Sequence, residues 1–315
     1  MTNPGRGDNR LDPLLIFETL VGSRAYGLAG SDSDTDVKGV VVGPSSWYFG
    51  WRGGPEIIEL SADHVRYELR RYLQLCVAAN PTTLEMAWTR DEDRVMVHLL
   101  GERLLAERDR FLSKRVAERF GRYALSQLKR IRTHRSWLLS PPSGPPVRAQ
   151  FGLPDHTVIP ADQLAAAEKL FDEGRFDEAD VSANFVDLLV RERRYKAAQK
   201  HWAMYRRWER ERNPARAALE ARYGYDTKHA MHLARLQRMA LEILTTGNVV
   251  VYRPDCEELL AIRSGAWTFD ELESNSARLA AEIESAAAIS ALPAEPDEDA
   301  IDRLCADLVA EGIGC

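Results

Sequence analysis

The chain has 315 residues, 45% of them hydrophobic and 29% charged, and its formal net charge is −6. This size fits two domains of ordinary length better than one, and the mildly acidic balance excludes a generally cationic binder of the histone type. No apolar run approaches the roughly 20 residues needed to span a bilayer, and the polar N-terminal stretch lacks the apolar core of a secretory signal. The four cysteines are far apart and form no CxxC pair, which argues against a zinc ribbon or a disulfide scaffold and indicates a reducing, cytoplasmic setting.

Charge is unevenly distributed along the chain. Residues 103–135 hold 11 Lys/Arg against 3 Asp/Glu, residues 191–238 hold 14 against 5, and residues 255–315 hold 3 against 15. The two basic segments have a helical pattern and could attract a polyanion such as nucleic acid or a nucleoside triphosphate. The alternative is that they are solvated helix faces whose arginines pair with nearby acids.

The first hundred residues predict a mixture of strands and helices. Short apolar or β-branched runs predict strands at Leu14–Val21, Val37–Val42, Ile57–Leu60 and Val65–Tyr67. From Glu68 the spacing of apolar residues becomes helical, and this helix is expected to end near Asn80-Pro81.

The rest of the chain has a helical pattern. Helices are predicted at about 95–138, 161–173, 176–212, 226–246 and 298–311. The proline-rich residues 140–160 predict a long exposed loop. The expected fold class is therefore α+β, with a small mixed β-sheet domain followed by a mainly α-helical domain.

The segment Leu20–Val42 carries the residues with the clearest chemistry. Gly22-Ser23 follows a predicted strand, and Asp34 and Asp36 stand immediately before the next one. Residues i and i+2 of an extended chain project to the same side, so Asp34 and Asp36 can present two carboxylates to one point in space. Such a pair repels unless a cation lies between its members. Hard oxygen ligands of this kind favour Mg²⁺ or Mn²⁺.

The Gly22-Ser23 pair suits a phosphate beside such a cation. Glycine lets backbone amides approach a phosphate closely, and Ser23 adds a hydroxyl donor. Arg24 could donate a charge-assisted hydrogen bond to a triphosphate. Two divalent ions about 3.5–4 Å apart can clamp the attacking and leaving oxygens of phosphoryl transfer. Each motif is common alone, but their combination with a following apolar strand predicts a nucleotide site.

Other site motifs do not fit the sequence. Asp32, Asp34 and Asp36 mimic the start of a calcium-binding EF-hand loop, but its sixth position holds Val37 instead of glycine and its twelfth holds Gly43 instead of glutamate. The chain contains no GxxxxGK[ST] loop, no GxGxxG and no HExxH.

The sequence GSRAYGLAGSDSDTDVKGVVV (residues 22–42) resembles the signature of the DNA polymerase β-like nucleotidyltransferase superfamily. It is more closely similar to the RNA-ligase-associated nucleotidyltransferases of RNA repair. Three further segments support that closer resemblance: Asp63–Tyr72 (DHVRYELRRY), Asn80–Glu85 (NPTTLE) and Lys228–Arg235 (KHAMHLAR).

The resemblance implies a partition and a set of residue roles. Residues 13–115 would form the nucleotidyltransferase domain, residues 116–285 a helical domain that contributes to nucleotide or acceptor binding, and residues 286–315 an acidic C-terminal segment. Asp34 and Asp36 would bind the catalytic metals. Asp63 would be the third carboxylate, which also binds metal and helps to deprotonate the attacking hydroxyl, and Glu59 is its rival for that role.

The segment Lys228–Arg235 adds candidate nucleotide ligands. On a helix, Lys228, His232 and Arg235 lie at i, i+4 and i+7 and so share one face. A face of Lys, His and Arg opposite a metal site suits a triphosphate or a nucleic-acid strand. The alternative is a basic helix end that pairs with the acidic tail. The expected nucleotide-binding set comprises Gly22, Ser23, Arg24, Lys228, His232 and Arg235.

These inferences predict an enzyme, a Mg²⁺- or Mn²⁺-dependent nucleotidyltransferase that moves a nucleoside monophosphate from an NTP to a hydroxyl and releases pyrophosphate. The resemblance and the basic segments favour an RNA end as the acceptor, in RNA repair or tRNA modification. The alternatives are a protein side chain, as in antitoxin-like enzymes that attach AMP, a small molecule, or a non-catalytic nucleic-acid-binding module with this fold. The acidic tail could contact a partner such as an RNA ligase, and the choice of NTP stays open.

Overall fold

The computed structural model describes residues 12–30, 33–157, 159, 161–172 and 182–314. These residues form two compact units. The first unit takes its described residues from Met1–Arg132 and Asp226–Cys315, and the second comprises those of Thr133–Tyr225. Residues 116–132 and 226–285, expected in a separate helical domain, are thus part of the unit that contains the sheet. Across the described ranges, no helix is both long enough and apolar enough to cross a membrane.

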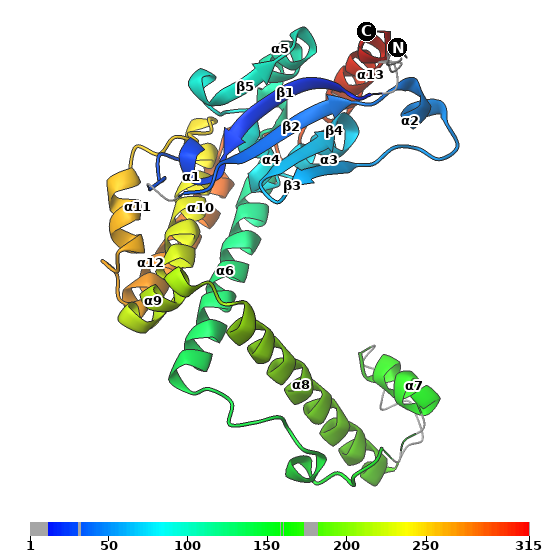
Figure 1. The fold of residues 1–315 in the computed structure, drawn as a ribbon, viewed down its shortest axis with the longest axis vertical. Coiled ribbons are helices and arrows are strands. Elements are labelled where there is room, and N and C mark those ends of the chain that lie inside the picture. The colour runs from blue at the N-terminus through cyan, green and yellow to red at the C-terminus, as the bar shows by residue number, and fades with distance from the viewer. Residues whose placement is uncertain (1–11, 31–32, 158, 160, 173–181, 315) are drawn as a thin grey trace, which may run out of the picture. The chain divides into compact units, whose positions relative to one another are not determined.

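The first unit contains a five-stranded mixed sheet (Figure 1). Its strand order is β3-β4-β2-β1-β5. The central strand β2 (Asp36–Val42) pairs antiparallel with β1 (Leu14–Val21) and parallel with β4 (His64–Glu68). The edge strands β3 (Ile57–Ser61) and β5 (Arg94–Val97) pair antiparallel with β4 and β1. All four predicted strands are present, and with the many helices described below they confirm the α+β fold class.

The strand β5 forms where the sequence predicts the start of a helix. Phe17 of β1 pairs with Val97 and Glu18 with Met96, so the exposed edge of β1 supplies a hydrogen-bonding partner that a local pattern cannot reveal. The helical segments that follow are α5 (Leu99–Ala106), a 3₁₀ turn η3 (Arg108–Phe111) and α6 (Arg115–Leu139). The prediction of one helix over 95–138 is therefore wrong for its first residues and for its continuity.

Capping side chains fix where the helices that follow the strands begin. Glu68, the last residue of β4, accepts hydrogen bonds from the amides of Arg70 and Arg71 at the start of α3 (Leu69–Val77). The side chain of Asn80 accepts from the amide of Thr82, and proline occupies the first position of α4 (Pro81–Met86). Such caps satisfy amides that lack partners within the helix. The remaining short elements before β5 are α1 (Gly22–Ala25), α2 (Ser45–Phe49) and the 3₁₀ turn η2 (Asp91–Asp93).

The C-terminal third of the chain completes the first unit. Its helices are α10 (Thr227–Thr246), α11 (Cys256–Arg263), α12 (Phe269–Ile289) and α13 (Glu298–Gly314). Helix α10 is largely buried and packs against α11 and α12, whereas α13 packs against α3, α5 and β2. A Cβ atom at Gly312 of α13 would lie under 3.0 Å from Val42 of β2.

Ion pairs join the acidic C-terminal third to the basic residues 103–135. Arg103 contacts Glu311 at 2.5 Å, Arg132 contacts Glu273 at 2.6 Å, and Arg115 contacts Glu295 and Glu298. These contacts match the alternative in which arginines of the basic segment pair with acids. Most of these side chains are well exposed to solvent, so each pair adds little stability. Their main effect is to reduce the positive charge of the basic segment.

The second unit is helical. It contains the end of α6, a 3₁₀ turn η4 (Arg148–Phe151), α7 (Ala161–Asp172), α8 (Ala183–Glu211) and α9 (Pro214–Tyr223). The indole of Trp137 donates a hydrogen bond to His201 at 2.8 Å and packs beside Trp208. Helix α8 confirms most of the helix predicted at 176–212, whose residues 176–181 lie outside the described part, as does residue 173 of the helix predicted at 161–173.

Candidate active site

The Gly22-Ser23 turn and the Asp36 carboxylate lie next to each other. Val21 and Asp36 are paired across β1 and β2, so the turn after β1 begins opposite the first residue of β2. Gly22 has a φ of +69°, and a Cβ atom there would lie under 3.0 Å from Asp36 Oδ2. Glycine adopts this conformation readily and leaves room for the carboxylate. The segments GS and DxD thus meet at one end of the sheet.

Asp63 lies near Asp36, directly before the neighbouring strand β4. Val37 pairs with His64 in the parallel β2–β4 ladder, and the Val37 amide donates a 2.7 Å hydrogen bond to the Asp63 carbonyl. The residues that precede Val37 and His64 are therefore neighbours across the ladder. Glu59, the rival third carboxylate, lies opposite Val65 on β3, one strand further from Asp36.

The acidic residues act on each other electrostatically. Asp36 is half-buried, whereas Asp34 and Asp63 are exposed. Burial raises the pKa of Asp36 above its usual value, and the negative charges of Asp63 and Asp34 raise it further, while Lys38 and Lys228 act in the opposite direction. Burial is thus the main reason why ionisation of Asp36 is disfavoured, and the neighbouring carboxylates add to it.

Two lysines, Lys38 and Lys228, bring positive charge to this end of the sheet. Lys38 follows Asp36 by two residues on β2, and its ammonium donates a 3.3 Å hydrogen bond to the hydroxyl of Tyr67. Lys228 and His232 come from the first two turns of α10, and both are partly exposed. Lys38 is absent from the sequence-based set, although the two-residue period that pairs Asp34 with Asp36 would also have placed Lys38 on their side.

Arg24 and Ser23 belong to the loop that leads to the acidic pair. The exposed Arg24 guanidinium donates a 2.9 Å hydrogen bond to the carbonyl of Ser33, the residue before Asp34. The Ser23 carbonyl accepts from the amide of Leu28 at 2.8 Å, which closes the turn after α1. Both side chains remain at least partly accessible to a ligand.

Arg235 has a different environment from Lys228 and His232. It is 5% exposed, and its Nη1 donates a 2.8 Å hydrogen bond to Glu85 Oε1. The hydroxyl of Tyr26 donates to the other oxygen of Glu85 at 2.5 Å, and the Arg235 guanidinium lies 3.7 Å from the centre of the Tyr26 ring. Burial raises the pKa of Tyr26 far above its ordinary value, so the phenol stays protonated and remains a donor.

This buried cluster connects three segments that are distant in the sequence. Tyr26 comes from the GSRAY turn, Glu85 ends NPTTLE and Arg235 ends KHAMHLAR. When one partner of an almost completely buried ion pair is removed, the folded protein is strongly destabilised, because the remaining charge is buried without its partner. The cluster therefore fixes α4 and α10 relative to the turn that holds Gly22. Sequence reasoning found the segments but not these contacts.

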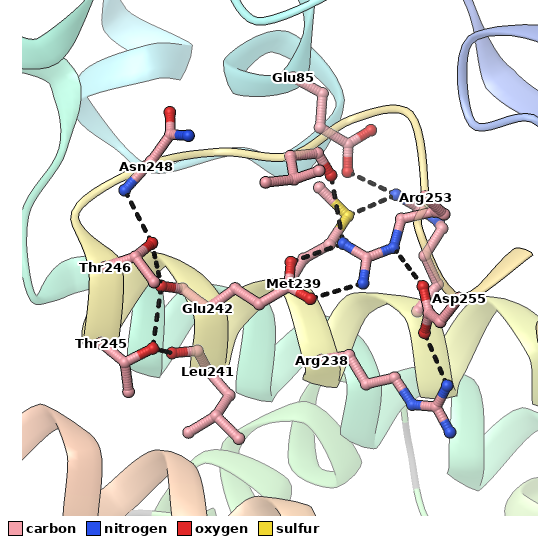
Figure 2. Close-up of polar contacts among 12 residues, drawn as sticks. Glu85, Arg238, Met239, Leu241, Glu242, Thr245, Thr246, Asn248, Arg253 and Asp255 are labelled. Atoms are coloured by element: carbon pink, nitrogen blue, oxygen red, sulfur yellow. Dashed lines mark hydrogen bonds and ion pairs between the residues drawn. The ribbon is translucent and has the colours of Figure 1, made fainter.

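A second buried arginine anchors the chain that follows α10. Arg253 is 1% exposed, and its two terminal nitrogens contact the two carboxylate oxygens of Glu242 at 2.6 Å each (Figure 2). Its Nε donates to Asp255 at 2.8 Å, and Asp255 also accepts from Arg238 at 2.6 Å. The backbone amide of Arg253 donates to the Tyr26 carbonyl at 3.1 Å. Residues 248–255 are thus tied to the same turn.

A mixed sheet with a glycine-serine turn beside clustered carboxylates is the arrangement expected of a polymerase β-like nucleotidyltransferase domain. The comparison with protein families supports this class: residues 8–138 match the RNA repair pathway DNA polymerase beta family, RlaP. The match includes Gly22-Ser23, Asp34, Asp36, Asp63 and Asn80–Glu85, and it confirms the family resemblance noted in the sequence. No curated protein and no solved structure matches the chain.

Proposed function

We propose that the protein is a metal-dependent nucleotidyltransferase that transfers a nucleoside monophosphate from an NTP to a hydroxyl at an RNA end. The supporting observation is the convergence of Asp36 and Asp63 with the Gly22 turn, in a domain that matches a family named for RNA repair. Because the family name indicates RNA, we take an RNA end as the acceptor.

The chemistry of the three aspartate side chains suits a divalent cation. Asp34, Asp36 and Asp63 offer hard carboxylate oxygens, which are the ligands that Mg²⁺ and Mn²⁺ prefer. Burial, and after it the negative charges of Asp63 and Asp34, raise the pKa of Asp36, and a cation among the three carboxylates would favour its ionised form. When bound, the cation would polarise phosphoryl oxygens and stabilise the charge that develops on them.

The other residues of the site would bind and orient the nucleotide. Ser23 offers a backbone amide and a hydroxyl that suit a phosphate oxygen. Gly22, the residue before it, has no side chain that would obstruct the phosphate. Arg24, Lys38, Lys228 and His232 would supply positive charge to the triphosphate. Arg235, held by Glu85, would position α10 from behind instead of contacting the nucleotide.

In the reaction, the acceptor hydroxyl oxygen forms a bond to the α-phosphorus, and the bond between that phosphorus and the α,β-bridging oxygen breaks. Pyrophosphate leaves with the electron pair of the broken bond. Asp63, exposed beside Asp36, would accept the proton of the attacking hydroxyl. Catalysis of this kind depends mainly on positioning and electrostatic stabilisation.

The test is incorporation of label from α-³²P-labelled NTPs, each with Mg²⁺ and with Mn²⁺, into an RNA oligonucleotide that ends in a free hydroxyl. We expect label in RNA, and we expect Asp34→Asn and Asp36→Asn to reduce its rate by about 100-fold or more. Glu59→Gln serves as the matched control, because it neutralises an exposed carboxylate on the next strand and should keep the rate of the wild type. Asp63→Asn should behave like the other two aspartate variants.

Two outcomes would contradict the proposal. Label in protein instead of RNA would indicate an enzyme that modifies side chains. No label with any NTP and either metal, together with unchanged Mn²⁺ affinity of Asp36→Asn in a calorimetric titration, would indicate a non-catalytic module.

A further inference from the structure

The connection between β2 and β3 exposes two large aromatic side chains. Phe49 is 83% exposed and Trp51 is 89% exposed. Figure 1 shows the helix of this connection, α2, next to one end of β2. Asp36 is the first residue of β2, at the other end of the strand. Large aromatic residues are usually buried because each hides a large apolar area from water. Two such neighbours on the surface therefore suggest a ligand.

The exposure of Phe49 and Trp51 is imposed by the packing of their neighbours. The ring of Trp47 lies so close to Gly43 and Gly54 that a Cβ atom at either glycine would come under 3.0 Å from it. The hydroxyl of Tyr48 donates a 2.9 Å hydrogen bond to Glu68 and accepts one from the Gly43 amide at 3.0 Å. Trp47 and Tyr48 thus fasten the connection to the sheet, and the residues after them point outward.

Arginines lie beside two aromatic rings of this connection. The Arg52 guanidinium lies 4.8 Å from the centre of the Trp51 ring, and that of Arg70 lies 4.5 Å from the centre of the Tyr48 ring. Together with Arg71 they line a cavity of about 530 Å³, whose wall also includes Trp47 and Trp51. This volume lies within the range of small-ligand sites.

The acids of this cavity are already engaged. Glu68 caps α3 and accepts from Tyr48, and Glu56 lies 3.4 Å from Arg71. Three arginines and two glutamates leave the lining with a net positive charge. Stacking surfaces next to arginines are typical of proteins that bind single-stranded nucleic acid, because bases stack on the rings and phosphates attract the cations.

We propose that this surface, formed by Phe49, Trp51, Arg52, Arg70 and Arg71, binds a single-stranded segment of the RNA acceptor. One base stacks on the open face of Trp51 and a second on Phe49, while phosphates contact Arg52 and the cavity arginines. The choice of RNA rests on the proposed function. At about 3.3 Å per residue, β2 separates this surface from Asp36 by about 20 Å, a span compatible with binding sites of 4–16 nucleotides.

Fluorescence anisotropy with the full-length chain and a 5′-fluorescein-labelled oligouridylate of about 12 nucleotides tests this proposal. We expect Trp51→Ala and Phe49→Ala each to weaken binding by about five-fold or more, because stacking on one ring stabilises a base substantially. Arg52→Ala should also reduce the slope of log affinity against log salt by about 0.7, the value for one phosphate contact on a single strand.

Matched controls separate these effects from general surface changes. Ile289→Ala removes an apolar side chain that is 86% exposed elsewhere on the same unit, and Arg278→Ala removes an exposed arginine of α12. Both should bind the oligonucleotide as the wild type does. Circular dichroism melting curves should be unchanged in all variants, since none of the replaced side chains is buried.

The proposal is overturned if Trp51→Ala and Phe49→Ala bind the oligonucleotide as tightly as the controls, or if a duplex of the same length competes as well as the single strand. The binding assay does not depend on catalysis, so the proposed RNA surface and the proposed enzymatic activity can fail separately. If the wild type transfers no label but Trp51→Ala still weakens RNA binding, the proposed enzymatic activity fails and this surface stands. If label is transferred normally but neither aromatic variant affects binding, the surface fails and the activity stands.

Discussion

Arg235→Met is expected to destabilise the first unit strongly. Arg235 and Glu85 are 5% and 3% exposed and share a 2.8 Å hydrogen bond. The substitution leaves the Glu85 carboxylate buried, with the Tyr26 hydroxyl as its remaining partner in this cluster. Removal of one partner of a buried ion pair costs about 3–5 kcal/mol. The loss of the contact over the Tyr26 ring acts in the same direction.

The double variant Arg235→Met, Glu85→Gln supplies the decisive comparison. It removes both charges, so its cost should be well below the sum of the two single costs, with a coupling energy of at least about 1 kcal/mol. Urea unfolding followed by circular dichroism at pH 7 measures the three free energies. If two transitions are seen, the shift should be confined to one of them. Single costs that add within about 0.5 kcal/mol would refute the reasoning.

The same variants decide whether Arg235 contacts the nucleotide, as the sequence predicts. If Arg235 only positions α10, a stable double variant should bind a fluorescent NTP analogue with nearly the affinity of the wild type. Lys228→Met provides the contrast, because Lys228 lies near Asp36 and is only partly buried. A double variant that is as stable as the wild type but binds the analogue more than about 10-fold weaker, or about 1.4 kcal/mol, would assign Arg235 to the nucleotide site.

Two further predictions concern single residues. Gly22→Ala should abolish nucleotide binding and destabilise the first unit by more than about 1 kcal/mol, because the added Cβ would collide with Asp36 at a φ of +69°. Calorimetric NTP titration measures the binding and urea unfolding measures the stability. A variant that is unimpaired in both would contradict the geometry. Burial opposes ionisation of Asp255, but hydrogen bonds from Arg238 and Arg253 outweigh it and lower the pKa of Asp255. That carboxylate therefore adds stability above its unfolded pKa of about 3.9, which is lost as the pH falls through its lower folded pKa. Asp255→Asn should consequently cost stability at pH 7 and show a shallower loss in acid, and equal acid slopes for variant and wild type would refute this.

Local rules account for the elements that the sequence predicts successfully. The apolar and β-branched runs of β1 and β2 depend on residues within a few positions of each other. The expectation that Asp34 and Asp36 act together also comes from one short segment. Asp34 lies before the first residue of β2, so this expectation stays a prediction.

Contacts between distant segments could not be read from local patterns. Strand β5 depends on the free edge of β1, and the parallel ladder that brings Asp63 to Asp36 depends on how β2 and β4 pair. In the sequence, Arg235 and Lys228 are both simply basic residues. The hydrogen bond to Glu85, 150 residues away, shows that Arg235 is part of a buried ion pair, whereas Lys228 is partly exposed. The acidic tail raised a similar ambiguity: Glu311 contacts Arg103, and Glu295 and Glu298 contact Arg115, whereas contact of the tail with a partner such as an RNA ligase stays a prediction.

The interrupted course of the first unit has a consequence for its biosynthesis. Its five strands have all been synthesised once Val97 is added, but α10 and α13, which cover the Glu85 cluster and Val42, are translated only after the entire second unit. Until then the nascent sheet exposes apolar surface and a carboxylate without its arginine, a state prone to aggregation. Completion of the proposed nucleotide site would therefore be a late event, and a fragment ending near residue 138 would lack the helices that cover the Glu85 cluster and Val42.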